Sequence, residues 1–200
     1  MKNKIIRHLS RDPIMAGLIE RYPYPDEIIP ISVYEKLISS IIFQQLSTKV
    51  ATVIHGRFLD LFENAYPDRE KLLSMDLATL RNAGLSRQKA NYVQNVAEFF
   101  QNEEIDENQW DKMTDDAIIQ YLTQIKGVGR WTVQMNLMFN LRRPDVFPVD
   151  DLGIQNAIKH LYEVDASTTK ELKEKMEKVA SPWKPFRTYA SWYLWRSTGT

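Results

Sequence analysis

The stretch from Ile125 to Val133 contains a Gly-x-Gly turn, Gly127-Val128-Gly129, between two segments with helical patterning. Two glycines let the chain reverse tightly and bring backbone N–H groups to the surface at the start of the next helix. Such amides, together with the helix N-terminus, can bind a phosphate without any side-chain charge. A plain helix–turn–helix corner with a glycine C-cap is the alternative, and the hairpin alone does not decide between the two.

Two adjacent carboxylates, Asp150 and Asp151, lie about twenty residues further on, directly after the extended run at 147–149. The apolar residues that follow have helical spacing, which places the pair at or near a helix N-terminus. An aspartate there can cap the helix and suits the helix dipole. If one carboxylate caps the helix, the other is left free for chemistry.

The elements that would position these residues are helical almost throughout. A buried helix face runs through Tyr34, Leu37, Ile38, Ile41 and Ile42, and a second stripe includes Val50, Val53, Ile54, Leu61 and Phe62. No alternating strand pattern with hairpin-turn residues appears, so the predicted fold class is all-α.

Several residues mark the ends of these helices. Ser47 can cap the helix that follows it, and Gly84 is well placed after a helix end, where a positive φ is needed. The pair Thr168 and Glu171 predicts a capping box. Residues 80–90 form a second helix–glycine–helix corner with basic residues of its own.

Composition limits the class of protein. The 200 residues suffice for one domain or two small lobes, and 26 Lys plus Arg balance 26 Asp plus Glu. Residues 97–116 carry eight acids against one lysine, so the remainder of the chain is mildly basic. We interpret this acidic stretch as a solvated linker. With no cysteine, disulfides, thiolate metal sites and iron–sulfur clusters are excluded.

No apolar run is long enough to span a membrane, and no secretory signal is evident. We therefore expect no membrane partner and a cytoplasmic location, associated with the nucleoid, or a nuclear one in a eukaryote.

Five separated segments in this order resemble the helix-hairpin-helix (HhH-GPD) DNA glycosylase superfamily, and within it the 3-methyladenine DNA glycosylase II branch of alkylation repair. The likeness extends from about Ile31 to Trp195. The segments are residues 41–47, 83–86, the hairpin, 147–153 and 183–190.

The resemblance implies one glycosylase unit built of two helical lobes, with the helix-hairpin-helix motif and an active-site cleft between them. Lobe A would span approximately residues 31–125, and lobe B approximately 1–30 plus 126–200. The N-terminal β domain of the bacterial enzyme is not expected, since only about 30 residues precede Ile31.

The family's catalytic aspartate corresponds to Asp151, with Asp150 as the alternative. Its carboxylate would stabilise the oxocarbenium character that develops at C1′ as the N-glycosidic bond breaks, and would orient the attacking water. Members that also cut the backbone have a lysine two residues after the second hairpin glycine, where this chain has Trp131. Because tryptophan cannot form a Schiff base, the resemblance implies a monofunctional enzyme without AP-lyase activity.

The resemblance also assigns the DNA contacts. Trp131 and Trp195 correspond to aromatic residues of the base pocket, where an indole can stack on a cationic base. Met135 stands where the family often has tyrosine, which leaves the width and polarity of the pocket open. Trp183 is expected in the core instead. Gln45 or Leu46 would fill the space that the flipped base leaves; a polar helix junction with Leu46 buried is the alternative.

The predicted phosphate contacts fall on the hairpin and on the corner before it: Lys126, Gly127, Gly129, Arg130, Arg87 and Lys89. The backbone of Ile125 and Gly127 would hold a structural K⁺ or Na⁺ ion, and no other cofactor is expected.

The sequence thus predicts a monomeric enzyme that removes bases of the 3-methyladenine and 7-methylguanine type from double-stranded DNA and leaves an abasic site. A non-catalytic DNA-binding module is one alternative. A glycosylase of the same fold for oxidised or deaminated bases is another.

Overall fold

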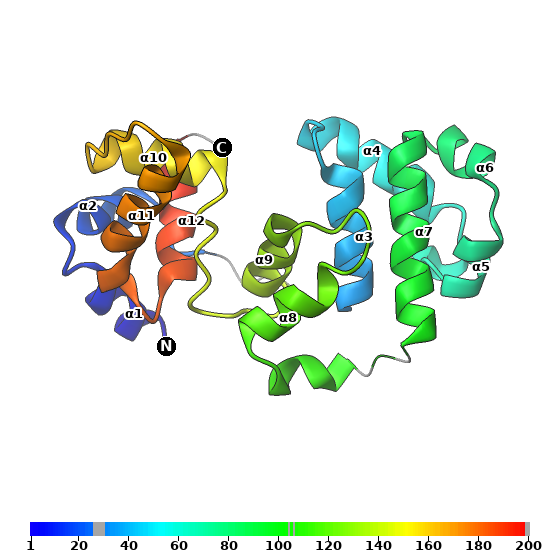
Figure 1. Ribbon diagram of the computed structural model, residues 1–200, viewed down its shortest axis with the longest axis horizontal. Coiled ribbons are helices and arrows are strands. Elements are labelled where there is room, and N and C mark those ends of the chain that lie inside the picture. Colours follow the sequence, from blue (N-terminus) through cyan, green and yellow to red (C-terminus); the bar gives the residue numbers. More distant parts are fainter. Residues whose placement is uncertain (26–30, 104, 106, 199–200) are drawn as a thin grey trace. The chain divides into compact units, whose positions relative to one another are not determined.

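The computed structural model describes residues 1–25, 31–103, 105 and 107–198, and these form helices with no strand among them (Figure 1). The predicted all-α class is therefore confirmed. Within these ranges, none of the helices combines the length and the apolar character needed to cross a bilayer.

The chain divides into two compact units. Unit 1 comprises Met1–Ile28 and Arg142–Thr200, and unit 2 comprises Ile29–Leu141. The second boundary thus lies at Leu141 and not near residue 125, because the helix after the hairpin packs against helices of unit 2. The expected cleft between two lobes stays a prediction.

Unit 2 contains the hairpin and most of the helices. These are α3 (Val33–Phe43), α4 (Thr48–Leu59), α5 (Arg69–Ser74), α6 (Leu77–Asn82), α7 (Arg87–Asn102), α8 (Asp115–Leu122) and α9 (Arg130–Phe139), with the 3-10 helices η1 (Glu63–Ala65) and η2 (Glu107–Lys112).

Helix α3 is the centre of unit 2, where it packs against α4, α7 and α9. Its start is fixed by a capping box: Ser32 Oγ accepts the amide of Glu35 at 3.1 Å, and Glu35 Oε2 accepts the amide of Ser32 at 3.2 Å. The stripe from Tyr34 to Ile42 is buried as predicted.

The predicted stripe on α4 was wrong in part. Val50 and Val53 are 46% and 49% exposed, whereas Ala51 and Phe58 are fully buried. The hydrophobic pattern alone allows two neighbouring faces, and packing against α3 selects the face that carries Ala51. Ser47 is the N-cap residue of α4 as expected, but its side chain makes no capping hydrogen bond.

The end of α6 shows why glycine is needed at position 84. Gly84 has φ 110°, its amide donates to Arg81 O at 2.9 Å, and the amide of Leu85 donates to Leu80 O at 3.3 Å. These are the two bonds of a Schellman motif, which requires a left-handed residue. The sequence-based prediction for Gly84 is confirmed.

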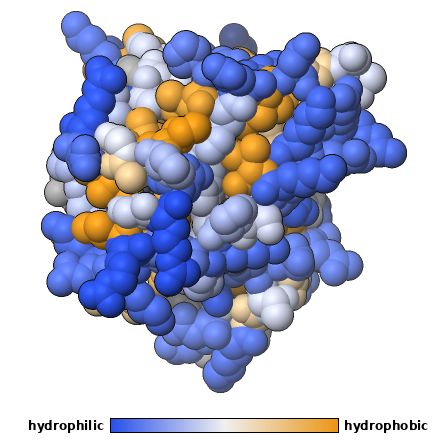
Figure 2. All heavy atoms as spheres, turned by 90° about the vertical axis from the view of Figure 1, so that its left-hand side faces the viewer, coloured by the Kyte–Doolittle hydropathy of each residue, from blue (hydrophilic) through white to orange (hydrophobic). Residues whose placement is uncertain are grey.

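Unit 1 joins the N-terminal segment to the C-terminal third of the chain. Its helices are α1 (Lys2–Leu9), α2 (Pro13–Arg21), α10 (Leu152–Leu161), α11 (Thr169–Ala180) and α12 (Arg187–Ser197), with the 3-10 helix η3 (Ser181–Trp183). Figure 2 shows one face of this unit, where hydrophobic side chains gather in a few areas between hydrophilic ones.

The predicted capping box at the start of α11 is only half formed. Thr168 Oγ1 accepts the amide of Glu171 at 3.2 Å, but the carboxylate of Glu171 accepts the amide of Ser167 and not that of Thr168.

The carboxylate of Asp12 connects three parts of unit 1. Its Oδ1 accepts the amides of Ile14 and Met15 at the start of α2. Its Oδ2 accepts Tyr162 Oη at 2.8 Å and Trp183 Nε1 at 2.9 Å. Trp183 is 1% exposed, which confirms the prediction that it belongs to the core.

Replacing Asp12 should therefore destabilise unit 1 strongly. We expect Asp12→Ala to lower the free energy of unfolding by about 3 kcal/mol or more, because it removes a helix cap and leaves two largely buried donors without acceptors. Asp68→Ala is the matched control, since that exposed cap bonds only the amide of Lys71, and should cost about 1 kcal/mol. Urea unfolding measures both, and equal losses would contradict this account.

Candidate active site

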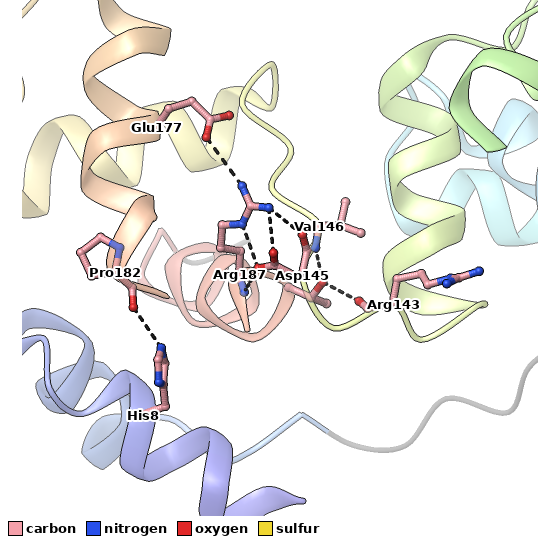
Figure 3. Close-up of polar contacts among 8 residues, drawn as sticks. His8, Arg143, Asp145, Val146, Glu177, Pro182 and Arg187 are labelled. Atoms are coloured by element: carbon pink, nitrogen blue, oxygen red, sulfur yellow. Dashed lines mark hydrogen bonds and ion pairs between the residues drawn. The ribbon is translucent and has the colours of Figure 1, made fainter. Parts of the chain in front are cut away.

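The segment that leads to the aspartate pair is anchored to α12 by an ion pair (Figure 3). Arg187 Nε and Nη2 donate to the two carboxylate oxygens of Asp145, each at 2.8 Å. Arg187 Nη2 also donates to the carbonyl of Asp145, and Nη1 lies 3.7 Å from Glu177 Oε2. A bidentate pair of this kind fixes direction as well as distance.

Thr188 holds the same segment from the next position of α12. Its Oγ1 donates to Arg143 O at 2.6 Å and accepts the amide of Val146 at 2.9 Å, and its own amide donates to Pro144 O at 3.1 Å. The sequence motif at 183–190 contains Arg187 and Thr188, but sequence reasoning gave them no role. Apart from Glu177, their partners lie more than 40 positions away, so no local signal could have identified them.

Asp151 stands at the N-terminus of α10, as the sequence predicts for the pair. Its Oδ1 accepts the amide of Ile154 at 2.9 Å and Trp195 Nε1 at 2.7 Å. Of the two adjacent carboxylates, Asp151 is therefore the one that caps α10. The capping bond and the indole together hold this carboxylate in one orientation.

A glycine makes the contact between Trp195 and Asp151 possible. A Cβ on Gly153 would lie 3.0 Å from Trp195 Cδ1 and 3.1 Å from Asp151 Oδ1. These distances are tighter than ordinary contacts, so a larger residue would displace either the indole or the carboxylate.

Asp150 has a different environment. It forms an ion pair with Lys173 on α11, and the two side chains are about 40% exposed. A surface pair of this kind contributes little to stability. The two adjacent carboxylates therefore differ: Asp151 is held by two directed hydrogen bonds, whereas Asp150 faces a flexible lysine.

The hairpin between α8 and α9 has the predicted backbone. Gly127 has φ 104°, and any side chain there would overlap the ring of Tyr92 on α7. Asn95 Nδ2, also on α7, donates to Lys126 O at 3.0 Å. Gly129 is the N-cap residue of α9 and provides no side-chain cap. The first amides of α9 therefore receive no capping bond from the side chain of the N-cap residue.

A cavity of about 630 Å³ lies between α3 and α9 in unit 2. It brings together three residues that the resemblance assigns to DNA, Trp131, Met135 and Gln45. Trp131 is 40% exposed and Met135 is 8% exposed. Sequence reasoning did not assign the other residues of the wall to a pocket, because α3, the loop after it and α9 come together only in the folded unit: Lys36, Ser39, Ser40, Phe43, Gln44 and Phe139.

A positively charged side chain, Lys36, lies in the wall of this cavity. Lys36 is half-buried, and burial lowers its pKa below the ordinary value. The pKa of His55 on α4 is lowered as well, first by burial and then by the charge of Lys36.

The loop after α3 has an unusual backbone. Gln45 is exposed and has φ 57°, a conformation that costs a non-glycine residue roughly 1–3 kcal/mol. Leu46 is 38% exposed, which contradicts the alternative that it is buried in a helix junction. Gln44 Nε2 lies 3.3 Å from Thr132 Oγ1 on α9 and ties the loop to the cavity wall.

The two basic residues of α7 differ in their surroundings. Arg87 is exposed, as a phosphate contact requires. Lys89 Nζ instead donates to Ile42 O at 2.8 Å and to Gln44 O at 2.7 Å. Its ammonium is thus engaged within unit 2, a role that the sequence did not predict.

Among the described residues, the predicted site residues form three groups. Asp151 and Trp195 lie together in unit 1, the cavity residues lie in unit 2, and the hairpin forms the third group. The described part of the chain has no cluster of three metal-ligating side chains.

Comparison with known proteins identifies a family and several similar proteins. Residues 38–182 match the model of the HhH-GPD superfamily base excision DNA repair protein. DNA-3-methyladenine glycosylase 1 of Schizosaccharomyces pombe is 37% identical over 82% of this chain and 72% of its own length.

Two solved structures are similar over 98% of this chain. One is the S. pombe 3-methyladenine DNA glycosylase Mag1 in complex with abasic DNA, with 34% identity, a TM-score of 0.86 and 97% of that chain covered. The other is a DNA-3-methyladenine glycosidase from Bacillus halodurans, with 33% identity, a TM-score of 0.82 and 89% covered. This chain therefore belongs to the HhH-GPD superfamily of base excision DNA repair proteins.

Proposed function

We propose that this protein is a monofunctional DNA glycosylase that excises alkylated bases from double-stranded DNA, as a monomer. The observation that carries the proposal is the carboxylate of Asp151, held by Ile154 and Trp195, in a chain of this family. The names of the similar proteins support the alkylated-base substrate.

The chemistry assigned to Asp151 is electrostatic. As the N-glycosidic bond breaks, its electron pair leaves with the base and positive charge develops at C1′ of the sugar. A fixed carboxylate stabilises that charge and orients a water, whose oxygen bonds C1′ and whose proton passes to solvent. An alkylated base that is already cationic leaves without a strong general acid. The product is an abasic site.

The proposed enzyme does not cleave the DNA backbone. Trp131, on the first turn of α9, has no amine that could attack C1′, so no Schiff base forms at this position. Its half-exposed indole can stack on a flipped base at the mouth of the cavity. Gln45 would fill the space in the duplex, and the amides at Gly127 and Gly129 would bind a phosphate.

A monovalent cation at the hairpin is part of the proposal. Ile125 O accepts the amide of Val128 at 3.0 Å and keeps a second lone pair, with which it could coordinate K⁺ or Na⁺ together with the carbonyl of Gly127. The cation would add positive charge for the bound phosphate.

Asp151→Asn tests the carboxylate. Asparagine is also a good N-cap, so α10 should stay folded while release of 7-methylguanine falls about 100-fold or more. Asp150→Asn is the matched control and should keep most of the activity, since Asp150 pairs only with an exposed lysine. Chromatography of bases released from methylated duplex DNA measures both.

The other outcomes distinguish the alternatives. If Asp150→Asn lost activity and Asp151→Asn kept it, Asp150 would be the catalytic residue and not Asp151. Wild-type protein that binds DNA but releases no base would identify a non-catalytic module. Release of only oxidised or deaminated bases would change the substrate class.

Trp195→Phe tests how Asp151 is oriented. The variant keeps an aromatic ring but removes the hydrogen bond to Oδ1, and a bond to a charged group is worth about 1.5–3 kcal/mol. We expect kcat to fall by roughly tenfold or more. Trp192→Phe on the same helix is the control and should leave kcat unchanged. Equal effects of both changes would indicate a general loss of packing.

Lys36→Met tests the cation in the cavity wall. A nearby ammonium repels a cationic base by an energy on the order of 1 kcal/mol. Its removal should therefore raise the release of 7-methylguanine relative to the uncharged 1,N6-ethenoadenine several-fold, whereas Lys36→Arg should keep the wild-type ratio. An unchanged ratio in Lys36→Met would place the ammonium away from the bound base.

A further inference from the structure

The last turn of α3 leaves four backbone carbonyls without partners inside the helix. The amide of Gln44 donates to Ser40 O and Ile41 O, and the amide of Leu46 donates to Phe43 O. Ile42 O receives its hydrogen bond from Lys89 Nζ of α7. The end of α3 thus depends on a side chain that is 47 positions away.

Lys89 bonds a second carbonyl in the adjoining loop. Its Nζ also donates to Gln44 O at 2.7 Å. A cation at this place suits the negative end of the helix dipole of α3. Lys89 is partly buried, and desolvation lowers its pKa.

This second bond acts on the strained residue of the loop. Gln44 O belongs to the peptide plane that enters Gln45, and that plane is one of the two that define φ of Gln45. By bonding Gln44 O, Lys89 restrains the peptide plane that directly precedes Gln45, whose φ is 57°. The side chain of Gln44 is held separately by Thr132.

We propose that Lys89 is a positioning residue for the DNA wedge: it holds the loop that presents Gln45, so that Gln45 can enter the duplex when a base is flipped out. The proposal rests on the wedge role given to Gln45 above. It differs from the phosphate contact that the sequence predicts for Lys89, because the ammonium serves the protein's own carbonyls.

The two roles predict different kinetics. A phosphate contact contributes to binding of any duplex, and its loss reduces the salt dependence of binding. A wedge-positioning residue matters when a paired base must be extruded, and less when the lesion lacks a pairing partner and extrusion costs less. The ratio of activities on paired and unpaired lesions therefore separates them.

The experiment measures single-turnover release of 7-methylguanine from two duplexes. In one the lesion lies opposite cytosine, and in the other it lies opposite an abasic analogue. We expect Lys89→Met to slow release from the paired duplex about tenfold and from the unpaired one less than about threefold. Lys89→Arg keeps donors for both carbonyls and should restore the wild-type ratio.

Two further variants serve as controls. Arg87→Met on the same helix should change binding and its salt dependence equally for both duplexes. Lys178→Met, on an exposed face of α11, should change neither. Lys89→Gln retains amide donors and is used if Lys89→Met does not fold, as judged by circular dichroism. The fluorescence of 2-aminopurine beside the lesion reports base extrusion directly and should rise more slowly in Lys89→Met.

The outcomes are distinct. A selective loss on the paired duplex with slow extrusion supports the proposal. An equal loss on both duplexes, or no loss, overturns it. Wild-type protein that releases no base from either duplex would overturn the proposed function instead, while the fluorescence signal would still test the role of Lys89.

Discussion

Two donors converge on Oδ1 of Asp151, and much of unit 1 serves to bring them there. The amide of Ile154 belongs to α10 and the indole of Trp195 belongs to α12. A carboxylate with one partner could rotate, but one that bonds donors from two helices turns only if the helices separate. The packing of α10 on α12 is thus a condition for the orientation of the carboxylate.

The ends of α12 have complementary tasks. At its start, Arg187 binds Asp145 and fixes the segment that enters the site. Near its end, Trp195 reaches the carboxylate across Gly153, where a side chain would not fit. Helix α12 therefore fixes both the path of the segment that begins at Asp145 and the orientation of the Asp151 carboxylate.

In unit 2 the hairpin and the loop of Gln45, which are both proposed to meet DNA, lie at helix ends. The hairpin has its amides at the start of α9. The wedge loop, residues 44–46, follows directly after the C-terminal end of α3. Amides and helix termini attract phosphate without formal charge. A net charge of zero is therefore compatible with DNA as the partner in this family.

Local pattern was sufficient for features that depend on neighbours in the chain. The helices, the left-handed Gly84 and the helix start at the aspartate pair follow from spacing and residue type. The burial of Trp183 in the core was also predicted.

Features that depend on distant partners could not be predicted in the same way. The second hydrogen bond to the carboxylate of Asp151 comes from Trp195, 44 positions away. The exposure of Val53 follows from the orientation of α4 on α3. The bonds of Lys89 exist only because α7 passes the end of α3, and a basic residue near a glycine corner gives no sign of this.

Helix α7 touches both loops that are proposed to meet DNA. Lys89 holds the wedge loop, while Tyr92 packs on Gly127 and Asn95 bonds the carbonyl of Lys126 in the hairpin. Six residues of helix separate Lys89 from Asn95, which is about 9 Å along the axis. One helix thus holds the loop of Gln45 and the hairpin, which are both proposed to meet DNA, at a fixed spacing within unit 2.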